Sequence, residues 1–151
     1  MARSTGKAGQ ILMILLDTNV LSAMMRVARE PAVERWLDAQ PPESVWTTTI
    51  TIFEICFGLI LLAPGRRRGR LCDAFDRAID EILSGRVLPF DRTAAESAAA
   101  IAAKQRQIGQ PVEIRDVQIA GIALVRKATL ATRNTRHFTG LGIILIDPWQ
   151  A

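Results

Sequence analysis

Short apolar runs alternate along the chain with longer segments that have the features of helices. Residues 11–16 form a continuous apolar run, which is typical of a central strand buried on both faces of a sheet. Further short strands are predicted at 45–49, 86–90, 129–132 and 143–146. Helices are predicted, from apolar spacing or from capping residues, at 31–40, 51–63, 71–83, 91–108 and 114–128. This alternation predicts an α/β fold with a central parallel sheet of four to five strands, covered by helices on both faces.

The length and composition predict one folded domain. The chain has 151 residues, of which 49% are hydrophobic, and this excludes disorder for most of it. Its longest apolar runs fall well short of the roughly 20 residues needed to cross a bilayer, so we expect no membrane span. Two cysteines provide neither a disulfide framework nor a zinc-ligand spacing, which indicates the reducing cytoplasm. We expect an N-terminal tail at 1–12, disordered or introduced by cloning, before a single domain at 13–151.

The basic residues are almost all arginines. The net charge is +4, with 16 Arg and three Lys among the 19 basic residues, and four of the arginines at 66–70 form a predicted basic turn. Arginine binds phosphate bidentately, so the composition favours an anionic partner such as RNA or DNA. A GC-rich genome would also favour arginine over lysine, so composition alone does not identify the partner.

Polar side chains follow two of the predicted strands at the point where each strand ends. Asp17, Thr18 and Asn19 follow the first strand, and Thr132, Arg133 and Asn134 follow the strand at 129–132. The carboxyl ends of parallel strands lie at one edge of a sheet, where ligands bind. Glu54 and Asp116 lie in the first turns of two predicted helices. We therefore expect three carboxylates and the Asn134 amide to line one cleft.

Such a cluster of carboxylates repels itself unless a cation neutralises it. Carboxylate and amide oxygens suit Mg²⁺ or Mn²⁺, and such an ion in a cleft promotes hydrolysis of phosphodiester bonds. His137 is the only histidine, and the chain has no glycine-rich phosphate loop. The pattern therefore favours metal-assisted hydrolysis over a serine or cysteine nucleophile.

Each of these residues also has a purely structural interpretation. Asp17 fits a helix N-cap, and Glu54 fits a capping box with Thr51. Asp116 fits the positive end of its helix. The aromatic residues Phe53 and Phe57 are expected in the core.

Four segments, taken together, resemble the PIN-domain family, in particular the VapC toxins of bacterial toxin–antitoxin pairs and their FitB-type branch. They are MILLDTNVLS, TITIFEICFG, EIRDVQIAGIALV and LATRNTRHF, and they occur in the family's order between Met13 and Trp149. The resemblance implies a three-layer α/β/α domain. It also implies a Mg²⁺- or Mn²⁺-dependent endoribonuclease toxin that a VapB-like antitoxin neutralises in the cytoplasm.

Matching these segments to the family assigns the site. Asp17, Glu54 and Asp116 would be metal ligands and catalytic residues, with Asn134 as a further catalytic residue. The family usually has another acidic residue at the position of Asn134 or His137, and this chain has neither. Asn134 would then orient water or phosphate through its amide, and we expect one well-occupied ion.

The resemblance also suggests assisting residues and partners. Thr18, Asn19 and Thr132 would hydrogen-bond the ligating carboxylates, and Glu113 would be an outer-sphere acid or simply solvent-exposed. RNA phosphates would contact Arg115, Arg133 and Arg136, unless these arginines only screen the carboxylates. We expect a homodimer, and an antitoxin bound along the helices predicted at 51–63 and 71–83.

Two other functions remain open at this stage. The missing fourth carboxylate is compatible with a degenerate PIN domain that binds RNA or antitoxin without cleavage. A haloacid-dehalogenase-like phosphatase also has an aspartate after its first strand. It would need a second aspartate where Asn19 stands, and a lysine that the sequence does not place near the site.

Overall fold

The computed structural model describes residues 12–151, so the tail predicted at 1–12 lies, apart from its last residue, outside the described residues. A five-stranded parallel sheet runs through the middle of the fold in the order β3-β2-β1-β4-β5. The strands are β1 (Ile14–Leu16), β2 (Val45–Thr48), β3 (Val87–Leu88), β4 (Thr129–Ala131) and β5 (Ile144–Ile146). All five strands were predicted, each with somewhat wider bounds. The strand order reverses beside β1, where an open parallel sheet places its ligand site.

Within residues 12–151, six α-helices join the strands. They are α2 (Thr18–Met25), α3 (Pro31–Asp38), α4 (Thr49–Leu61), α5 (Arg66–Arg77), α6 (Arg92–Gln107) and α7 (Ile114–Arg126). Shorter helical turns are η1 (Pro42–Ser44), η2 (Ala78–Ile82) and η3 (Thr135–His137). None of the helices in the described part of the chain is both long and apolar enough to span a bilayer.

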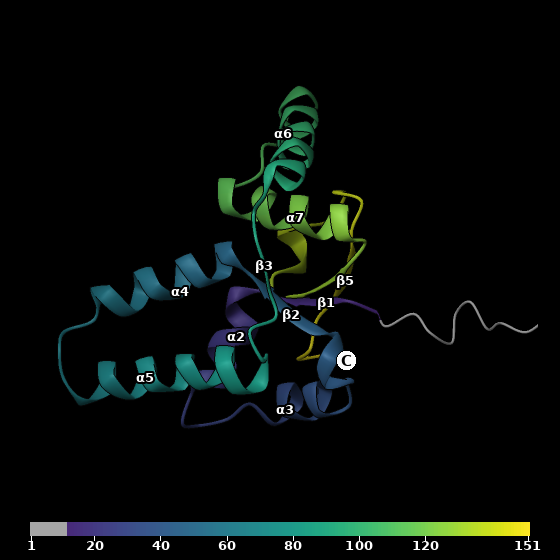
Figure 1. Ribbon diagram of the computed structural model, residues 1–151. Coiled ribbons are helices and arrows are strands. Elements are labelled where there is room, and N and C mark those ends of the chain that lie inside the picture. The colour runs from purple at the N-terminus through teal and green to yellow at the C-terminus, as the bar shows by residue number, and fades with distance from the viewer. Residues whose placement is uncertain (1–11) are drawn as a thin grey trace, which may run out of the picture.

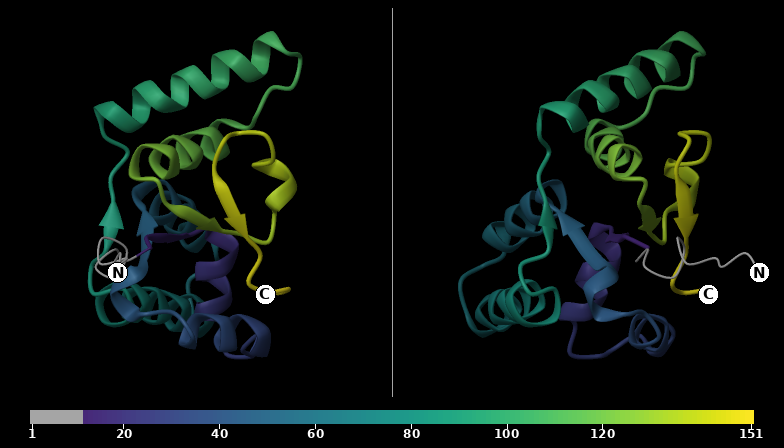
Figure 2. Two further views of the ribbon diagram at one scale, coloured as in Figure 1. Left: turned by 90° about the vertical axis from the view of Figure 1, so that its right-hand side faces the viewer. Right: turned by 45° about the vertical axis from the view of Figure 1, so that its right-hand side comes forward.

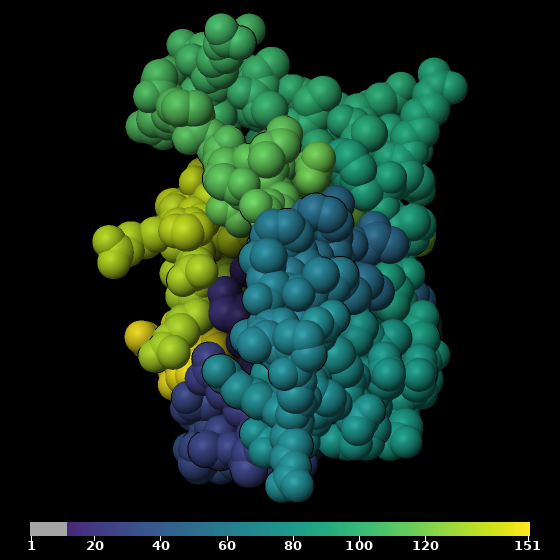
Figure 3. Space-filling model, turned by 90° about the vertical axis from the view of Figure 1, so that its left-hand side faces the viewer, coloured from purple at the N-terminus to yellow at the C-terminus, as the bar shows by residue number. Residues whose placement is uncertain are grey.

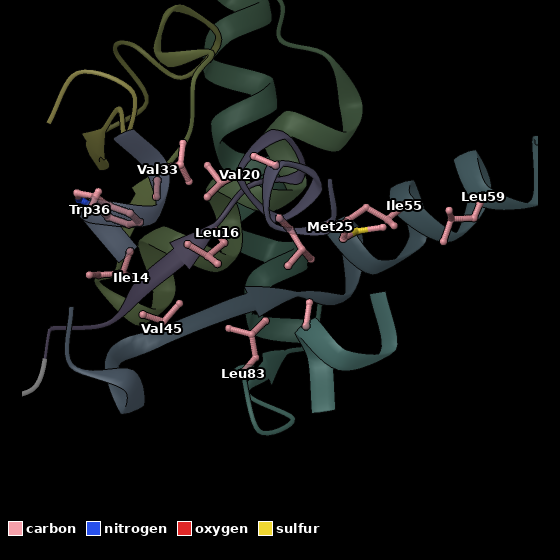
Figure 4. Packing of buried hydrophobic residues seen from close by; sticks show 14 residues of the cluster. Ile14, Leu16, Val20, Met25, Val33, Trp36, Val45, Ile55, Leu59 and Leu83 are labelled. Carbon is pink, nitrogen blue, oxygen red and sulfur yellow. The ribbon is translucent and has the colours of Figure 1, made fainter. Parts of the chain in front are cut away.

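Alternate residues of the strands serve two separate cores, one on each face of the sheet. Leu15 and Leu130 pack under α6 and α7, whereas Ile14 and Leu16 pack under α2, α3 and α5. Figure 4 shows this second core from close by, with Val33 and Trp36 of α3 near the strand residues. In Figures 1 and 2, α6 and α7 lie on one side of the sheet and α3 and α5 on the other. The three-layer α/β/α architecture is therefore confirmed.

The contact between α6 and α7 depends on small residues. A Cβ added at Gly121 of α7 would lie 2.6 Å from the backbone oxygen of Ala94 and 2.8 Å from the Cβ of Ala98. The two helices approach too closely there for any side chain. Gly121 thereby fixes the position of α7, whose first turn carries Asp116.

Several local predictions were wrong. The first helix, α2, was not predicted, and the arginines at 66–70 form the first turns of α5 rather than a turn between helices. The capping box between Thr51 and Glu54 does not form, because α4 begins earlier and Thr48 is its N-cap. Its Oγ1 accepts a hydrogen bond from the Thr51 N–H at 3.2 Å.

The outer face of α4 also differs from expectation. Phe53 and Phe57 were expected in the core, but their side chains are 57% and 51% exposed. Their rings stack on each other with centroids 6.0 Å apart. The helix turns Ile55 and Leu59 inward instead, so it buries one stripe and leaves an apolar stripe in solvent. An exposed apolar stripe of this kind is typical of a protein interface, and the sequence pattern does not reveal it.

Candidate active site

Asp17 lies at the junction of β1 and α2, where the sheet reverses its strand order. Its backbone N–H donates to the Ala131 carbonyl of β4 at 2.9 Å, which extends the β1–β4 pairing to this residue. Its side chain caps α2, because Oδ1 accepts from the Thr18 N–H at 2.8 Å. The residue is 6% exposed. Asp17 is therefore both a helix cap and a buried carboxylate at the sheet edge, so its two interpretations are compatible.

A network of hydrogen bonds ties the end of β4 to Asp17. The Thr132 hydroxyl donates to Asp17 Oδ2 at 2.7 Å, and the Asn19 amide donates to the same oxygen at 3.4 Å. Thr132 Oγ1 in turn accepts from the Asn134 N–H at 3.0 Å, and Asn19 Oδ1 accepts from the Arg133 N–H at 3.0 Å. The polar residues that follow β1 and β4 thus form one hydrogen-bonded corner of the site, at the carboxyl ends of these two strands.

Glu54 comes from the second turn of α4 and faces this corner. Its Oε1 accepts a hydrogen bond from Thr18 Oγ1 at 3.0 Å, and its Oε2 lies 3.7 Å from Nη1 of Arg115. Glu54 is thus held by groups from α2 and α7. Glu54 therefore contacts residues of two other helices and does not form the capping box with Thr51 that the local sequence suggested.

Asp116 comes from the first turn of α7. The N-cap of this helix is Glu113, whose Oε2 accepts from the N–H groups of Arg115 and Asp116 at 2.9 and 3.2 Å. Asp116 Oδ2 lies 3.2 Å from Nδ1 of His137, which belongs to η3. The cap leaves the Asp116 carboxylate free to face the opposite wall of the site.

These side chains share a cleft of about 700 Å³. Figure 3 shows its floor, where the dark purple start of the fold lies between α4 and the yellow C-terminal segment. Of the predicted site residues, all but Thr132 and Arg133 line the cleft, namely Asp17, Thr18, Asn19, Glu54, Glu113, Arg115, Asp116, Asn134 and Arg136. Thr132 lies behind it, fully buried, and Arg133 lies at its side.

The cleft has further polar residues that sequence reasoning did not select. Gln105 of α6 is buried in its wall and reaches the Gln110 carbonyl at 3.4 Å. His137 and Thr139 line the opposite side. The resemblance had marked the position of His137, whereas Gln105 and Thr139 reach the site only through the tertiary packing of the fold and carry no local signal in the sequence.

The three carboxyl groups have raised pKa values. Burial is the first cause in each case, because it penalises the charged form. The charge of Asp17 raises the pKa of Glu54 and of Asp116 further. Hydrogen bonds from Thr132 and Thr18 and the nearby Arg115 and His137 oppose these shifts without cancelling them. A cation bound beside these carboxylates would favour their charged forms and relieve the repulsion between them.

The donor set fits a hard divalent cation that keeps some of its water. Between residues 12 and 151, no three His, Cys, Asp or Glu side chains gather closely enough to hold an ion by themselves. Mg²⁺ is usually bound through one or two carboxylates plus waters, and Mn²⁺ also suits carboxylate and water ligands. Asp17 and Asp116, with Glu54 beside them, supply this kind of site.

Comparisons with known proteins agree with this architecture. A family model described as the PIN domain matches residues 14–142. The plasmid stability protein StbB of Pseudomonas syringae pv. tomato is 40% identical over 139 residues, which cover 92% of this chain and all of that protein. The VapC ribonuclease Y4jK of Sinorhizobium fredii is 36% identical over 91% of this chain and 99% of its own length. Toxin FitB of Neisseria gonorrhoeae is 34% identical over 91% of this chain and 99% of its own length. The crystal structure of FitAcB from the same bacterium has a TM-score of 0.83 and covers 92% of this chain and all of the matched chain.

Proposed function

Because the chain belongs to the PIN-domain family, we propose that it is the toxin of a toxin–antitoxin pair and a metal-dependent endoribonuclease. The observation that carries the proposal is the buried carboxylate Asp17 facing Glu54 and Asp116 in one cleft. The pKa of each carboxyl is raised, as expected for a site that is completed by a cation. The names of the relatives, a VapC ribonuclease and a FitB toxin, support the same activity.

Asp17 and Asp116 would hold the ion, with Glu54 as a third ligand, directly or through water. Mg²⁺ or Mn²⁺ bound there supplies a more acidic water and charge neutralisation at the scissile phosphate. Thr132 and Asn19 fix the orientation of the Asp17 carboxylate through their hydrogen bonds, and Thr18 does the same for Glu54.

The remaining cleft residues would position the substrate. The Asn134 amide would orient a water or a phosphate oxygen, because its backbone is held on Thr132 while its side chain is exposed at the cleft. Arg115 and Arg136 would hold RNA phosphates at the rim, together with Arg133 beside it. Glu113 would act as an outer-sphere acid in addition to capping α7. With no fourth carboxylate, we expect one well-occupied ion.

The apolar stripe of α4 supports the proposed protein partners. Besides Phe53 and Phe57, Ile60 and Leu61 are exposed on this helix, and a stripe of this size marks a protein interface. A VapB-like antitoxin bound over α4 and α5 would cover it in the cytoplasm. We also propose a homodimer, and light scattering of the protein alone and with its antitoxin would establish both stoichiometries.

The test is cleavage of total RNA by purified, antitoxin-free protein in Mg²⁺, Mn²⁺ or EDTA. We expect discrete fragments that require the metal and that are absent with Asp17→Asn. Arg126→Ala, at the far end of α7, is a matched control that should cleave like the unmodified protein. Metal-dependent turnover of p-nitrophenyl phosphate without RNA cleavage would indicate a phosphatase. Intact RNA in every lane, with RNA binding retained, would indicate a degenerate domain that binds without cutting.

A further inference from the structure

A second hollow of about 380 Å³ opens beside the cleft, along the segment that follows β4. It is lined by Arg133, Asn134, Thr135, Arg136 and His137. Three of these residues, Asn134, Arg136 and His137, also line the cleft, so the two spaces adjoin. No carboxylate lines the hollow, and two arginines do. An anionic ligand that occupies the cleft can therefore continue into it.

Arg133 is held in one place at the side of this hollow. Its guanidinium carbon lies 4.8 Å from the centroid of the Trp149 ring, within the range of a cation–π contact. Its backbone N–H donates to Asn19 Oδ1 at 3.0 Å, which anchors the residue to the start of α2. Arg133 is therefore fixed both at its backbone and at the end of its side chain.

Trp149 is held by apolar packing and by a backbone hydrogen bond. Its ring packs against the core under α2 and α3, and its backbone N–H donates to Asp147 Oδ1 at 2.9 Å. The turn that begins at Asp147 directly follows β5. The C-terminal segment thus supplies an aromatic surface beneath the Arg133 guanidinium.

This arrangement leaves the guanidinium accessible to a ligand. Its central carbon lies over the Trp149 ring, and Arg133 is exposed as a residue. Proteins that bind unpaired RNA stack bases on aromatic rings or on guanidinium planes, and the N–H groups at the edge of arginine bind phosphate. A guanidinium that is already ordered loses less entropy on binding than a free one.

We propose that this hollow is the subsite for an unpaired RNA nucleotide next to the scissile phosphate, with its base stacked on Arg133. Trp149 is a positioning residue that acts through Arg133. The assignment rests on the proposed function, because the cleft must hold the scissile phosphate for the neighbouring nucleotide to reach the hollow. RNA is favoured over a protein segment for two reasons. The hollow continues from the cleft, and the group held beside it is the planar, positively charged guanidinium of Arg133.

The test is binding of a fluorescent single-stranded oligoribonucleotide, measured by anisotropy in EDTA so that no cleavage occurs. We expect Arg133→Ala to weaken binding by about tenfold, in the range of one lost base stack. Trp149→Leu should weaken it several-fold without changing the salt dependence, because no charge is removed. Trp149→Phe should bind like the unmodified protein, and Arg126→Ala, which removes the same charge elsewhere, should have little effect.

The double variant separates positioning from a direct contact. If Trp149 acts through Arg133, Trp149→Leu should add nothing to Arg133→Ala. If circular dichroism shows that Trp149→Leu does not fold, Arg133→Lys provides the test instead. This variant keeps the positive charge but loses the planar guanidinium on which a base would stack. Equal binding by Arg133→Lys and the unmodified protein would overturn the subsite, as would equal effects of Arg133→Ala and Arg126→Ala. Binding that depends on Arg133 without any metal-dependent cleavage would support the subsite and contradict the proposed nuclease.

Discussion

The two walls of the cleft are built differently. The wall at the end of β1 is rigid, because Asp17 is buried and accepts hydrogen bonds from Thr18, Asn19 and Thr132. The wall at the start of α7 is more open, because Asp116 is only half-buried and its partner His137 is exposed. Substitutions on the first wall should therefore lower both the stability of the protein and its activity. Substitutions on the second wall should lower activity alone.

The largest expected effect is on cleavage when either wall loses its charge. Asp17→Asn and Asp116→Asn should each lower activity by more than the roughly 10- to 100-fold typical of outer-sphere partners, since each removes a ligand. They should differ in stability. Asp17→Asn loses an acceptor for buried donors and should cost about 1–3 kcal/mol, whereas Asp116→Asn should cost almost nothing.

The stability of the two variants would be measured by denaturant unfolding, and their activity by RNA cleavage. Both variants should keep the circular dichroism spectrum of the unmodified protein. Full activity in either variant would contradict the assignment of the metal ligands. Equal losses of stability would contradict the contrast between the walls.

The next largest effect is expected at the hydroxyls that hold the carboxylates. Thr132→Val leaves the Asn134 N–H without its partner and Asp17 Oδ2 with only the longer bond from Asn19, so it should cost about 1–3 kcal/mol, with a 10- to 100-fold loss of activity. Thr18→Val is the matched control, because its hydroxyl bonds only the half-buried Glu54 and should matter less. Unfolding and cleavage assays on both variants would check that Thr132→Val has the larger effect. A smaller effect of Thr132→Val than of Thr18→Val would contradict this expectation.

Metal ions should stabilise the protein more as the pH rises. The pKa of each of the three carboxyls is raised, so the folded protein binds these protons more tightly than the unfolded chain. Metal-free stability therefore falls as the pH rises above the ordinary carboxyl range of about 4, and a bound cation removes that loss. Melting scans with and without Mn²⁺ between pH 5 and pH 8 should show a growing gain, in keeping with roughly 2–4 °C per kcal/mol. A gain that shrinks with pH, or that persists in Asp17→Asn, would contradict the site.

The smallest expected effect concerns the open wall. His137→Asp adds a carboxylate beside Asp116, at one of the two positions where the resemblance implies a further acidic residue. It should tighten Mn²⁺ binding by about tenfold, which corresponds to roughly 1.4 kcal/mol. Calorimetry would measure this, with His137→Asn as the control that adds no charge. Unchanged affinity would mean that the position does not face the ion.

The sequence predicted the parts of the fold that depend on local patterns. The apolar run before Asp17 identified the central strand, and Asp91 identified the start of α6, where its side chain accepts from the Ala94 N–H at 2.9 Å. The helix α2 was left out of the predicted elements although Asp17 fits a helix N-cap, because neither a glycine nor a basic last turn marks its C-terminal end. The start of α5 was missed because a run of arginines suggests a turn, although tertiary packing supports a helix there.

In the site too, local patterns predicted some residues, and tertiary packing determined others. Asp17, Glu54 and Asp116 were chosen because they follow strands or begin helices, and the fold brings them to one cleft. Thr18 was predicted to hydrogen-bond a ligating carboxylate, and it donates to Glu54. The contact of Asp116 with His137 was not predicted, because it joins distant segments. The exposure of Phe53 was not predicted either, because a helix that is apolar on most of its surface does not show in its sequence which face packs inward.

The most direct test of the metal site is a crystal structure with Mn²⁺, with the ion located by its anomalous scattering. We predict one strong peak within ligand distance of oxygen atoms of Asp17 and Asp116, beside Glu54, and its loss in Asp116→Asn. A peak elsewhere, or an empty cleft at a Mn²⁺ concentration that supports RNA cleavage, would contradict the account.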